Sequence, residues 1–221
     1  MISSLDALES RLRSRLDAPL PGAVAQWRFA PTPPLAGWSP DLTPDTARRA
    51  AALILLYPGI DGPSLALTVR RADLPHHPGQ VSLPGGALDP GESPLAAALR
   101  ETEEEIGVDP ASLRVIGPLS SLWVIVSNFL LQPYIATTDV RPDFRPAPHE
   151  VAEMLEVPIS HLIDAGRVSW SRRTIRDREI QYPQFLLAGH AVWGATAMVL
   201  GEFACLFDPD FTPPTRPDDG S

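Results

Sequence analysis

Three glutamates in the sequence are spaced so that their carboxylates can act together. Glu101, Glu104 and Glu105 stand at positions i, i+3 and i+4, and residues with this spacing are neighbours on a helix. Their negative charges repel one another, and a bound divalent cation reverses the sign of that interaction. Oxygen ligands without histidine or cysteine suit Mg²⁺ or Mn²⁺, and such a cation polarises phosphoryl oxygens and helps to generate hydroxide from water. The spacing therefore predicts a metal site for phosphate chemistry.

The helix that would carry these glutamates is delimited by its flanking residues. Ser93 can act as the N-cap, Pro94 suits the first helical position and Gly107 is a natural C-terminal stop. A helix over residues 94–106 follows, preceded by a glycine loop. At about 100° per residue, we expect the glutamates on one side and a packing stripe on the other; the stripe consists of Leu95, Leu99, Thr102 and Ile106.

Two further charged residues accompany the glutamates. Glu92 lies at the start of the helix, where a carboxylate suits the helix dipole, and we expect it to pair with Arg100 and so orient the metal ligands. A glutamate-rich helix face taken alone is more commonly a solvated surface. Here Gly86, Glu92, Arg100 and Gly107 occur with it at fixed offsets, which favours a metal site.

The segment from Gly86 to Val108 resembles the Nudix box, Gly-x5-Glu-x7-Arg-Glu-U-x-Glu-Glu-x-Gly-U with U aliphatic. Its fixed positions are met by Gly86, Glu92, Arg100, Glu101, Glu104, Glu105 and Gly107. Thr102 replaces the usual aliphatic residue, which concerns packing rather than metal binding. The resemblance implies an α/β (α+β) Nudix fold, with a mixed β-sheet sandwiched between helices, and hydrolysis of a nucleoside diphosphate linked to another moiety. It also implies Mg²⁺ or Mn²⁺ ligands at Glu101, Glu104, Glu105 and the carbonyl of Gly86.

The preceding segment, Leu67–Gly86, is similar to the signature of the coenzyme A pyrophosphatase subfamily. The matches are Leu67, Thr68, Arg70, Leu74, His77, Gly79, Gln80, Val81, Ser82, Pro84, Gly85 and Gly86. Arg71, Pro75 and Leu83 depart from it. This resemblance implies cleavage of coenzyme A or its derivatives to adenosine 3′,5′-bisphosphate and 4′-phosphopantetheine. Hydrolysis of ADP-ribose or another nucleoside diphosphate derivative is the alternative, and a non-catalytic nucleotide-binding regulatory module is a further one.

Substrate contacts are expected near the glycine loop. Arginine binds phosphate in bidentate fashion, so Arg70 and Arg71, with His76 and His77, are the candidates to receive the 3′-phosphate of coenzyme A. Gly85 and Gly86 are further substrate-binding candidates. A structural ion pair of Arg70 is the alternative. A rival phosphate site is the basic run of Arg172, Arg173, Arg176 and Arg178. Trp193 is expected to belong to the core rather than to stack on a base.

The catalytic candidates are Arg100, Glu104, Glu105 and Glu150. In the Nudix family a general base can come from the box helix or from a glutamate on a downstream loop. Glu150 and Glu104 are therefore the two candidates for the base. Ordinary surface charge is the alternative role for Glu150, as it is for Glu153 and Glu156.

Composition narrows the class of partner. A net charge of −9 among 221 residues argues against nucleic acid, because backbone phosphates attract a basic face, whereas a cation can join an acidic site to a small phosphate-bearing substrate. No run reaches 18 apolar residues, and charges interrupt the N-terminus where a signal peptide would be apolar. One cysteine, Cys205, fits a reducing compartment. We expect a cytoplasmic protein without membrane contact.

The chain is expected to have three parts. Residues 1–45 contain an amphipathic helix over 4–17 and a proline-rich connector, residues 46–208 form the catalytic domain, and residues 209–221 form a flexible tail. The apolar stripe of the first helix must pack on the domain or on a second subunit, so a homodimer is one expectation. The expected strands are 51–57 and 65–69, joined at Asp61–Gly62, and 113–116, 122–126, 129–136 and 179–187, with a closing helix over 189–206.

Overall fold

The computed structural model describes residues 4–39, 42–74, 78–175 and 178–217, apart from the side chains of residues 175 and 178. A mixed sheet of eight strands is central to these residues, with the order β3-β2-β1-β7-β5 and with β4, β6 and β8 pairing to β1, β7 and β2. Its strands are β1 (Arg48–Gly59), β2 (Gly62–Arg70), β3 (Val81–Ser82), β4 (Gly85–Ala87), β5 (Arg114–Pro118), β6 (Leu122–Val124), β7 (Phe129–Thr137) and β8 (Val151–Pro158). β1 runs parallel to β7 and antiparallel to β2.

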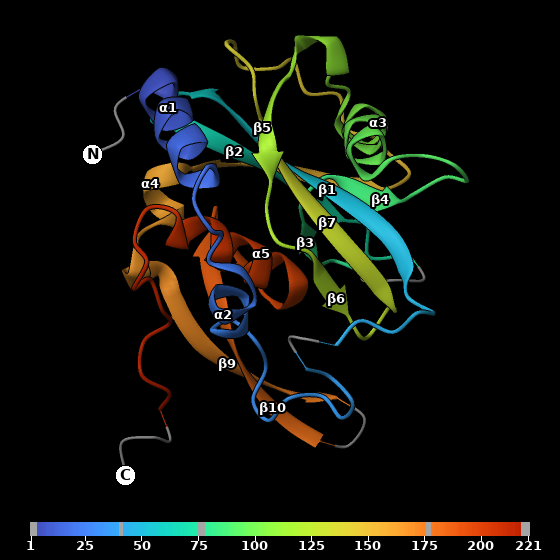
Figure 1. The fold of residues 1–221 in the computed structure, drawn as a ribbon, viewed down its shortest axis with the longest axis vertical. Helices are drawn as coiled ribbons and strands as arrows, with labels where there is room; N and C mark the ends of the chain where they lie inside the picture. The colour runs from blue at the N-terminus through green and yellow to red at the C-terminus, as the bar shows by residue number, and fades with distance from the viewer. Residues whose placement is uncertain (1–3, 40–41, 75–77, 176–177, 218–221) are drawn as a thin grey trace.

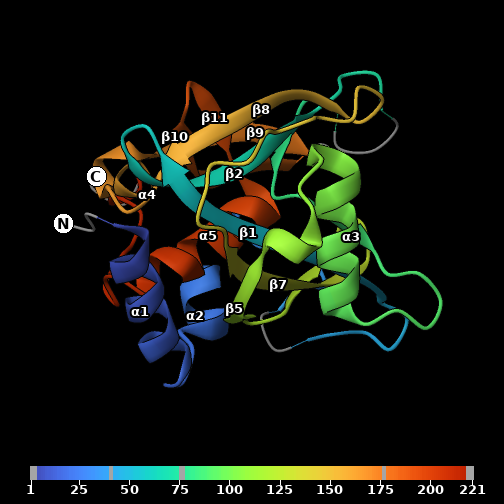
Figure 2. The same cartoon turned by 90° about the horizontal axis from the view of Figure 1, so that it is seen from above.

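A smaller antiparallel sheet lies beside the first (Figure 1) and consists of β9 (Val168–Ile175), β10 (Arg178–Leu187) and β11 (His190–Val192). The helices are α1 (Leu5–Leu16), α2 (Gly22–Trp27), α3 (Pro94–Ile106), α4 (Ile159–Leu162) and α5 (Gly194–Cys205), with short 3₁₀ turns at Pro110–Ser112 and Ala165–Arg167. Figure 2 shows α3 on one side of the large sheet, away from α1, α2 and α5. The expected Nudix sandwich of a mixed sheet between helices is therefore confirmed.

The sequence of β1 explains why the large sheet has a core on each of its faces. Because successive strand residues point to opposite faces, its continuous apolar run supplies two cores. Ala52, Ile54 and Leu56 belong to the core under α1 and α5, whereas the alternate residues Ala51, Leu53, Leu55 and Tyr57 belong to the core under α3. The central strand is therefore buried on both faces.

The expected elements agree with the structure except near the C-terminus. The Asp61–Gly62 turn joins β1 to β2, where Gly59 pairs with Gly62, and α1 and α3 occupy the expected segments. The closing helix begins at Gly194 rather than at residue 189, because Gly189 adopts a left-handed conformation and turns the chain into β11, which pairs with β10. Strands β3, β4, β8, β9 and β11 were not predicted: β3, β4 and β11 are two or three residues long, and the apolar residues of β8 and β9 do not alternate strictly.

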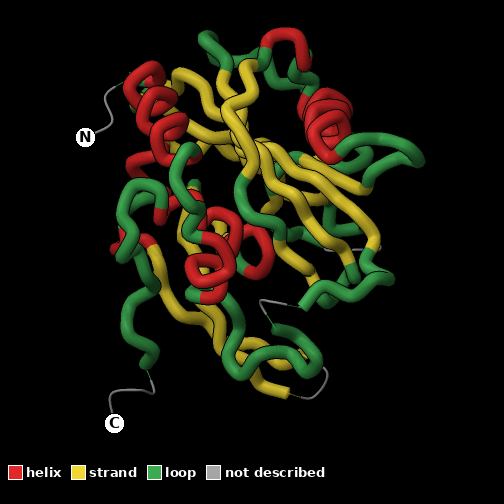
Figure 3. The backbone as a smooth tube through the Cα atoms, viewed as in Figure 1, coloured by secondary structure: helices red, strands yellow, loops and turns green. Residues whose placement is uncertain are grey.

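The two end segments share the core of the domain. Leu8 and Leu12 of α1 are fully buried in the core beside α5, so the stripe of α1 requires no second subunit. The beginning of the expected flexible tail contacts the core: Phe211 is 2% exposed and stacks on Phe29 and Phe185, and Arg28 donates hydrogen bonds to the carbonyl oxygens of Pro209 and Phe211. Burial of the Phe211 ring holds this segment on the domain, although its composition resembles that of a linker. Figure 3 shows the segment as loop alongside the small sheet.

No helix among the described residues is long and apolar enough to cross a membrane.

Candidate active site

α3 begins and ends where its flanking residues predict. The hydroxyl of Ser93 accepts a hydrogen bond from the amide of Ala96 at 3.2 Å, and Gly107 ends the helix in the left-handed conformation, with φ of 72°. These two caps satisfy backbone groups that a helix end leaves unpaired. They place the glutamates on the last two turns, beside β4 and the glycine loop.

The buried face of α3 differs from the expected one. Ala98 and Thr102 are fully buried and Glu105 is only 4% exposed, so the buried face passes through Glu105. The prediction that all three glutamates lie opposite the packing side is therefore wrong for Glu105. The small side chain of Ala98 explains the difference, because it lets the helix approach the sheet along this line. Thr102 is accommodated here because its hydroxyl donates a 2.6 Å hydrogen bond to the carbonyl oxygen of Ala98.

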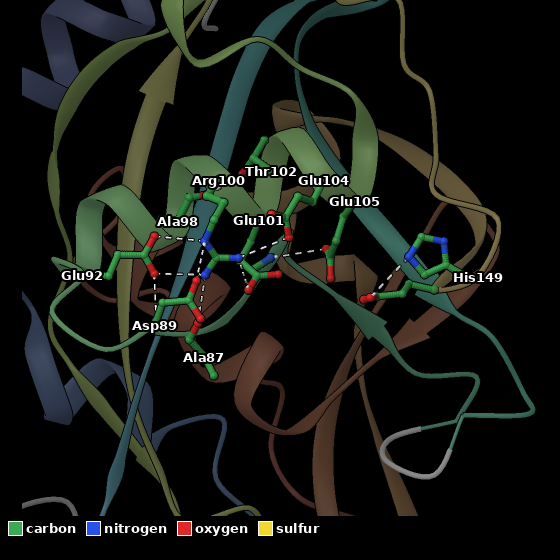
Figure 4. Close-up of polar contacts among 12 residues, drawn as sticks. Ala87, Asp89, Glu92, Ala98, Arg100, Glu101, Thr102, Glu104, Glu105 and His149 are labelled. Atoms are coloured by element: carbon green, nitrogen blue, oxygen red, sulfur yellow. Dashed lines mark hydrogen bonds and ion pairs between the residues drawn. The ribbon is translucent and has the colours of Figure 1, made fainter.

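Arg100 connects the other carboxylates of the site (Figure 4). Its guanidinium donates to both carboxylate oxygens of Glu92 at 3.0 Å, which is the predicted ion pair. It also donates to Glu101 at 2.8 Å, to Glu104 at 3.2 Å and to the carbonyl oxygen of Ala87 at 3.1 Å. Hydrogen bonding from Arg100 lowers the pKa of Glu92. One guanidinium thus offsets the repulsion among several carboxylates and ties α3 to β4.

Glu105 is held differently, inside the domain. Its Oε2 accepts a 3.3 Å hydrogen bond from the amide of Gly85, and its Oε1 lies 3.8 Å from Nη1 of Arg70. Burial raises its pKa to about 8; the Gly85 bond and Arg70 oppose this shift, whereas the charges of Glu101 and Glu150 add to it. Burial also raises the pKa of Glu101. An additional cation beside these two groups would favour their ionised forms.

The residues present fit a hard divalent cation. A Cβ at position 86 would lie 2.5 Å from the carboxylate of Glu101, so the absence of a side chain at Gly86 allows this close approach. Over the described ranges, no three acidic, histidine or cysteine side chains already form a metal-binding group, because Arg100 holds Glu101 and Glu104. The side chain of Glu104 is 60% exposed and can turn away from Arg100. Glutamate and backbone carbonyl oxygens are donors that Mg²⁺ and Mn²⁺ prefer.

Glu150 is the downstream glutamate whose charge acts on this cluster, and its carboxylate lies 3.7 Å from the ring of His149. Its charge raises the pKa of both Glu101 and Glu105, and the loop that carries it is fixed by a 3.0 Å bond from the amide of Arg71 to its carbonyl oxygen. The other two glutamates of this region have different partners: Glu153 lies 3.3 Å from His190, and Glu156 binds Arg141 and Tyr57. The alternative role in surface charge therefore suits these two better than Glu150.

A cavity of about 890 Å³ opens beside the glutamate cluster. It lies between the large sheet and the small sheet, and Gly85, Gly86 and Ala87 form part of its wall. Two walls come from the ends of the chain: Phe29, Pro31, Leu35 and Trp38 precede β1, and Ile180, Tyr182, Trp193 and Met198 come from β10 and the region of α5. Arg48, Arg70 and Arg173 are the lining residues with positive charge among those described.

The predicted substrate residues are only partly brought together. Arg70 lines the cavity, and its Nε is buried without a hydrogen-bond partner. Arg71 is instead bound to Asp73 and to the carbonyl oxygen of Pro148 and is not part of the lining. His76 and His77 lie outside the described residues.

The arginines of the rival basic run also lie in different surroundings. Arg173 lines the cavity, whereas Arg172 points toward Glu179, with its Nη1 3.9 Å from the carboxylate. Arg176 and the side chain of Arg178 lie outside the described structure. Trp193 was expected in the core, but it is half-buried and also lines the cavity. Sequence reasoning assigned no role to Arg48 or Tyr182, which belong to no motif and become wall residues only through long-range packing.

Comparisons with known proteins agree with this geometry. Residues 47–177 match the family described as NUDIX domain. A protein of Pectobacterium atrosepticum named uncharacterized Nudix hydrolase NudL is 33% identical over 168 residues, covering 75% of this chain and 86% of that protein. Its namesake from Citrobacter koseri is 35% identical over 160 residues, covering 71% and 82%.

Among solved structures, a Nudix hydrolase from M. smegmatis, RenU, is 27% identical, with a TM-score of 0.46 over 53% of this chain and 74% of that one. The family match covers more than half of the chain and includes the whole glutamate helix with its glycine loop. The chain therefore belongs to the Nudix hydrolase family.

Proposed function

We propose that this protein is a coenzyme A pyrophosphatase, which hydrolyses the diphosphate of coenzyme A or its derivatives to adenosine 3′,5′-bisphosphate and 4′-phosphopantetheine. The observation that carries this proposal is the size and place of the cavity. Its volume of about 890 Å³ is near the upper end of the roughly 300–1,000 Å³ of ligand pockets, and it borders the Gly85–Ala87 loop beside the glutamates. Such a cavity suits a large substrate whose diphosphate reaches that loop, and the resemblance of Leu67–Gly86 to the subfamily signature supports the same substrate.

The proposed metal ligands are Glu101, Glu104, Glu105 and the carbonyl of Gly86. A bound Mg²⁺ or Mn²⁺ would neutralise the diphosphate and increase the acidity of water. Arg100 orients Glu101 and supports the loop through the carbonyl of Ala87. In this proposal the three glutamates supply the negative charge that binds the cation, and Arg100 holds Glu101 and the glycine loop in position.

Glu150 is the proposed general base, and Glu104 is the rival. The charge of Glu150 raises the pKa of Glu101 and Glu105, and its carboxylate lies 3.7 Å from His149 and forms no hydrogen bond with Arg100. Glu104 is already bonded to Arg100, which occupies one of its carboxylate oxygens. Glu150→Gln should lower kcat about 10²–10⁴-fold; an equal loss in Glu104→Gln alone, with Glu150→Gln unaffected, would assign the base to Glu104.

The test is hydrolysis of coenzyme A, 3′-dephospho-coenzyme A and ADP-ribose at equal concentration with Mg²⁺, followed by mass analysis of the products. We expect coenzyme A to be cleaved fastest, with the two named products, and EDTA to stop the reaction. Glu105→Gln should fold, as judged by circular dichroism, and lose most of its turnover. Faster cleavage of ADP-ribose would overturn the substrate assignment, and full activity of Glu105→Gln would overturn the metal site.

A further inference from the structure

Arg173 lines the cavity, with its guanidinium over the ring of Trp193. It lies on β9, and its Cζ is 4.9 Å from the centroid of the Trp193 ring. Trp193 is in turn packed on Tyr182, with ring centroids 5.1 Å apart, and Tyr182 is 8% exposed. All three side chains line the cavity. The guanidinium therefore rests on an aromatic support that is anchored in the core.

This support lies close to the glycine loop in the fold. Trp193 directly precedes α5, and the hydroxyl of Thr196 in the first turn of α5 donates a 3.1 Å hydrogen bond to the carbonyl oxygen of Val81. Val81 is in β3, a short strand that leads into Gly85. Arg173 and the glycine loop beside the glutamate cluster thus border one cavity.

Stacking leaves the hydrogen-bonding groups of Arg173 available. A guanidinium on an aromatic face keeps its N–H donors in its own plane, where they can bind phosphate in bidentate fashion. The other lining cations are differently engaged: Arg48 lies 4.1 Å from the Phe129 ring and donates to the carbonyl oxygen of Ser127, and Arg70 lies beside Glu105. Within the described residues, no ion pair or hydrogen bond engages Arg173.

We propose that Arg173, held on Trp193, binds the 3′-phosphate of the substrate and so discriminates coenzyme A from nucleotides that lack this group. The inference rests on the proposed function, since it concerns the second anionic group of the same substrate. It assigns the diphosphate to the glutamate end of the cavity and the phosphate monoester to the small sheet. It also divides the basic run of the sequence: Arg173 contacts substrate, and its neighbour Arg172 does not.

The experiment compares kcat/KM for coenzyme A and 3′-dephospho-coenzyme A in the wild type, Arg173→Gln, Arg172→Gln and Arg48→Gln. Arg172→Gln is the matched control, because successive strand residues face opposite sides and Arg172 points toward Glu179. In Arg173→Gln we expect kcat/KM for coenzyme A to fall at least about tenfold, as for loss of a charged hydrogen bond, with 3′-dephospho-coenzyme A changed less than about twofold. Arg172→Gln should change neither, and melting temperatures confirm that the variants fold.

Several outcomes would overturn the assignment. One is an equal loss for both substrates in Arg173→Gln; another is no loss for either. If Arg48→Gln, but not Arg173→Gln, lost the preference for coenzyme A over 3′-dephospho-coenzyme A, the phosphate site would lie at Arg48 instead of Arg173. A wild type that cleaves coenzyme A no better than its dephospho form would also refute the inference while leaving the hydrolase assignment intact. A wild type that does not cleave coenzyme A at all would instead refute the proposed function.

Discussion

Gly86 has its role in the site because it lacks a side chain. The substitution Gly86→Ala places a methyl group 2.5 Å from the carboxylate of Glu101 and so must displace that group. The backbone at Gly86 is not left-handed, so we expect the free energy of unfolding to change by less than about 1 kcal/mol. Activity should fall about 10–100-fold, with more Mg²⁺ needed for half-maximal rate.

A Mg²⁺ titration of activity, paired with urea unfolding, measures both effects. Ala96→Ser is the control, because Ala96 is exposed on the first turn of α3 and does not line the cavity. An unchanged Mg²⁺ requirement in Gly86→Ala would show that Glu101 does not hold the cation.

At the scale of single residues, the sequence predicted which side chains interact better than it predicted how deeply each one is buried. The spacing of Glu101, Glu104 and Glu105 put these carboxylates on one helix, which is α3, and the offset of Glu92 from Arg100 predicted their ion pair, which the structure contains. The burial of Glu105 was not predicted, because the helical stripe was drawn through the large apolar residues. Ala98, with its small side chain, proved to lie on the innermost face.

At the scale of elements, an ion pair between Glu92 and Arg100 joins the loop before α3 to the helix. In Glu92→Gln the guanidinium loses its strongest acceptor, so its bonds to Glu101 and Glu104 should compete more strongly with a cation. We expect activity to fall about 10–100-fold, with a raised Mg²⁺ requirement and a melting temperature near that of the wild type. Asp89→Asn is the control, because Asp89 is 72% exposed and 3.8 Å from Arg100, and exposed pairs contribute little. An equal effect of both substitutions would contradict a positioning role for Glu92.

α1 is joined to the sheet by a charged contact as well as by apolar packing. Partial burial would raise the pKa of Glu9, but hydrogen bonds from Thr137, Arg13 and Arg114 outweigh it and hold the pKa at about 2. A carboxyl whose pKa is lower in the folded state stabilises the fold above its unfolded pKa of 4.5, and this contribution is lost as the pH falls through about 2.

We therefore expect Glu9→Gln to lower the free energy of unfolding at pH 7 by about 1–2 kcal/mol, which is less than the pKa difference alone implies because water screens the pairs. Urea unfolding of both proteins between pH 7 and pH 2.5 measures the difference. It should shrink below pH 4.5, where the unfolded carboxyl becomes protonated. A difference that does not depend on pH would mean that the ion pairs of Glu9 add nothing.

The elements that local signals define were predictable, and those that depend on pairing were not. Capping residues gave the bounds of α3, and Asp61–Gly62 gave the β1–β2 turn. β11 is three residues long and exists because it pairs with β10, which no local pattern indicates. The same is true of β8, whose burial follows from its pairing with β2.

In the whole molecule, the two end segments meet in one core. Phe211 stacks on Phe29 and Phe185, whose rings also stack on each other. Phe211→Ala should lower the free energy of unfolding by about 3–5 kcal/mol, as for other buried phenylalanines. Leu186→Ala is the control, because Leu186 is 46% exposed, and we expect less than about 1 kcal/mol. Urea unfolding measures both, and a loss in Phe211→Ala no larger than that in Leu186→Ala would show that the tail is free in solution.

The cavity is the feature that sequence reasoning could not reach. Its wall joins Phe29 and Trp38 to Tyr182 and Trp193, and these pairs are separated by most of the chain. Each residue alone resembles an ordinary core aromatic. Only the packing of the small sheet against the large one reveals that they enclose a shared space.

The origin of those walls has a consequence for how such a protein diversifies. The proposed metal-binding glutamates lie within residues 47–177, whereas Phe29, Trp38, Tyr182 and Trp193 lie outside that stretch. Mutations toward either terminus can therefore alter part of the cavity wall while the glutamate helix keeps its sequence. The rest of the wall, which includes Arg173, lies inside the matched stretch.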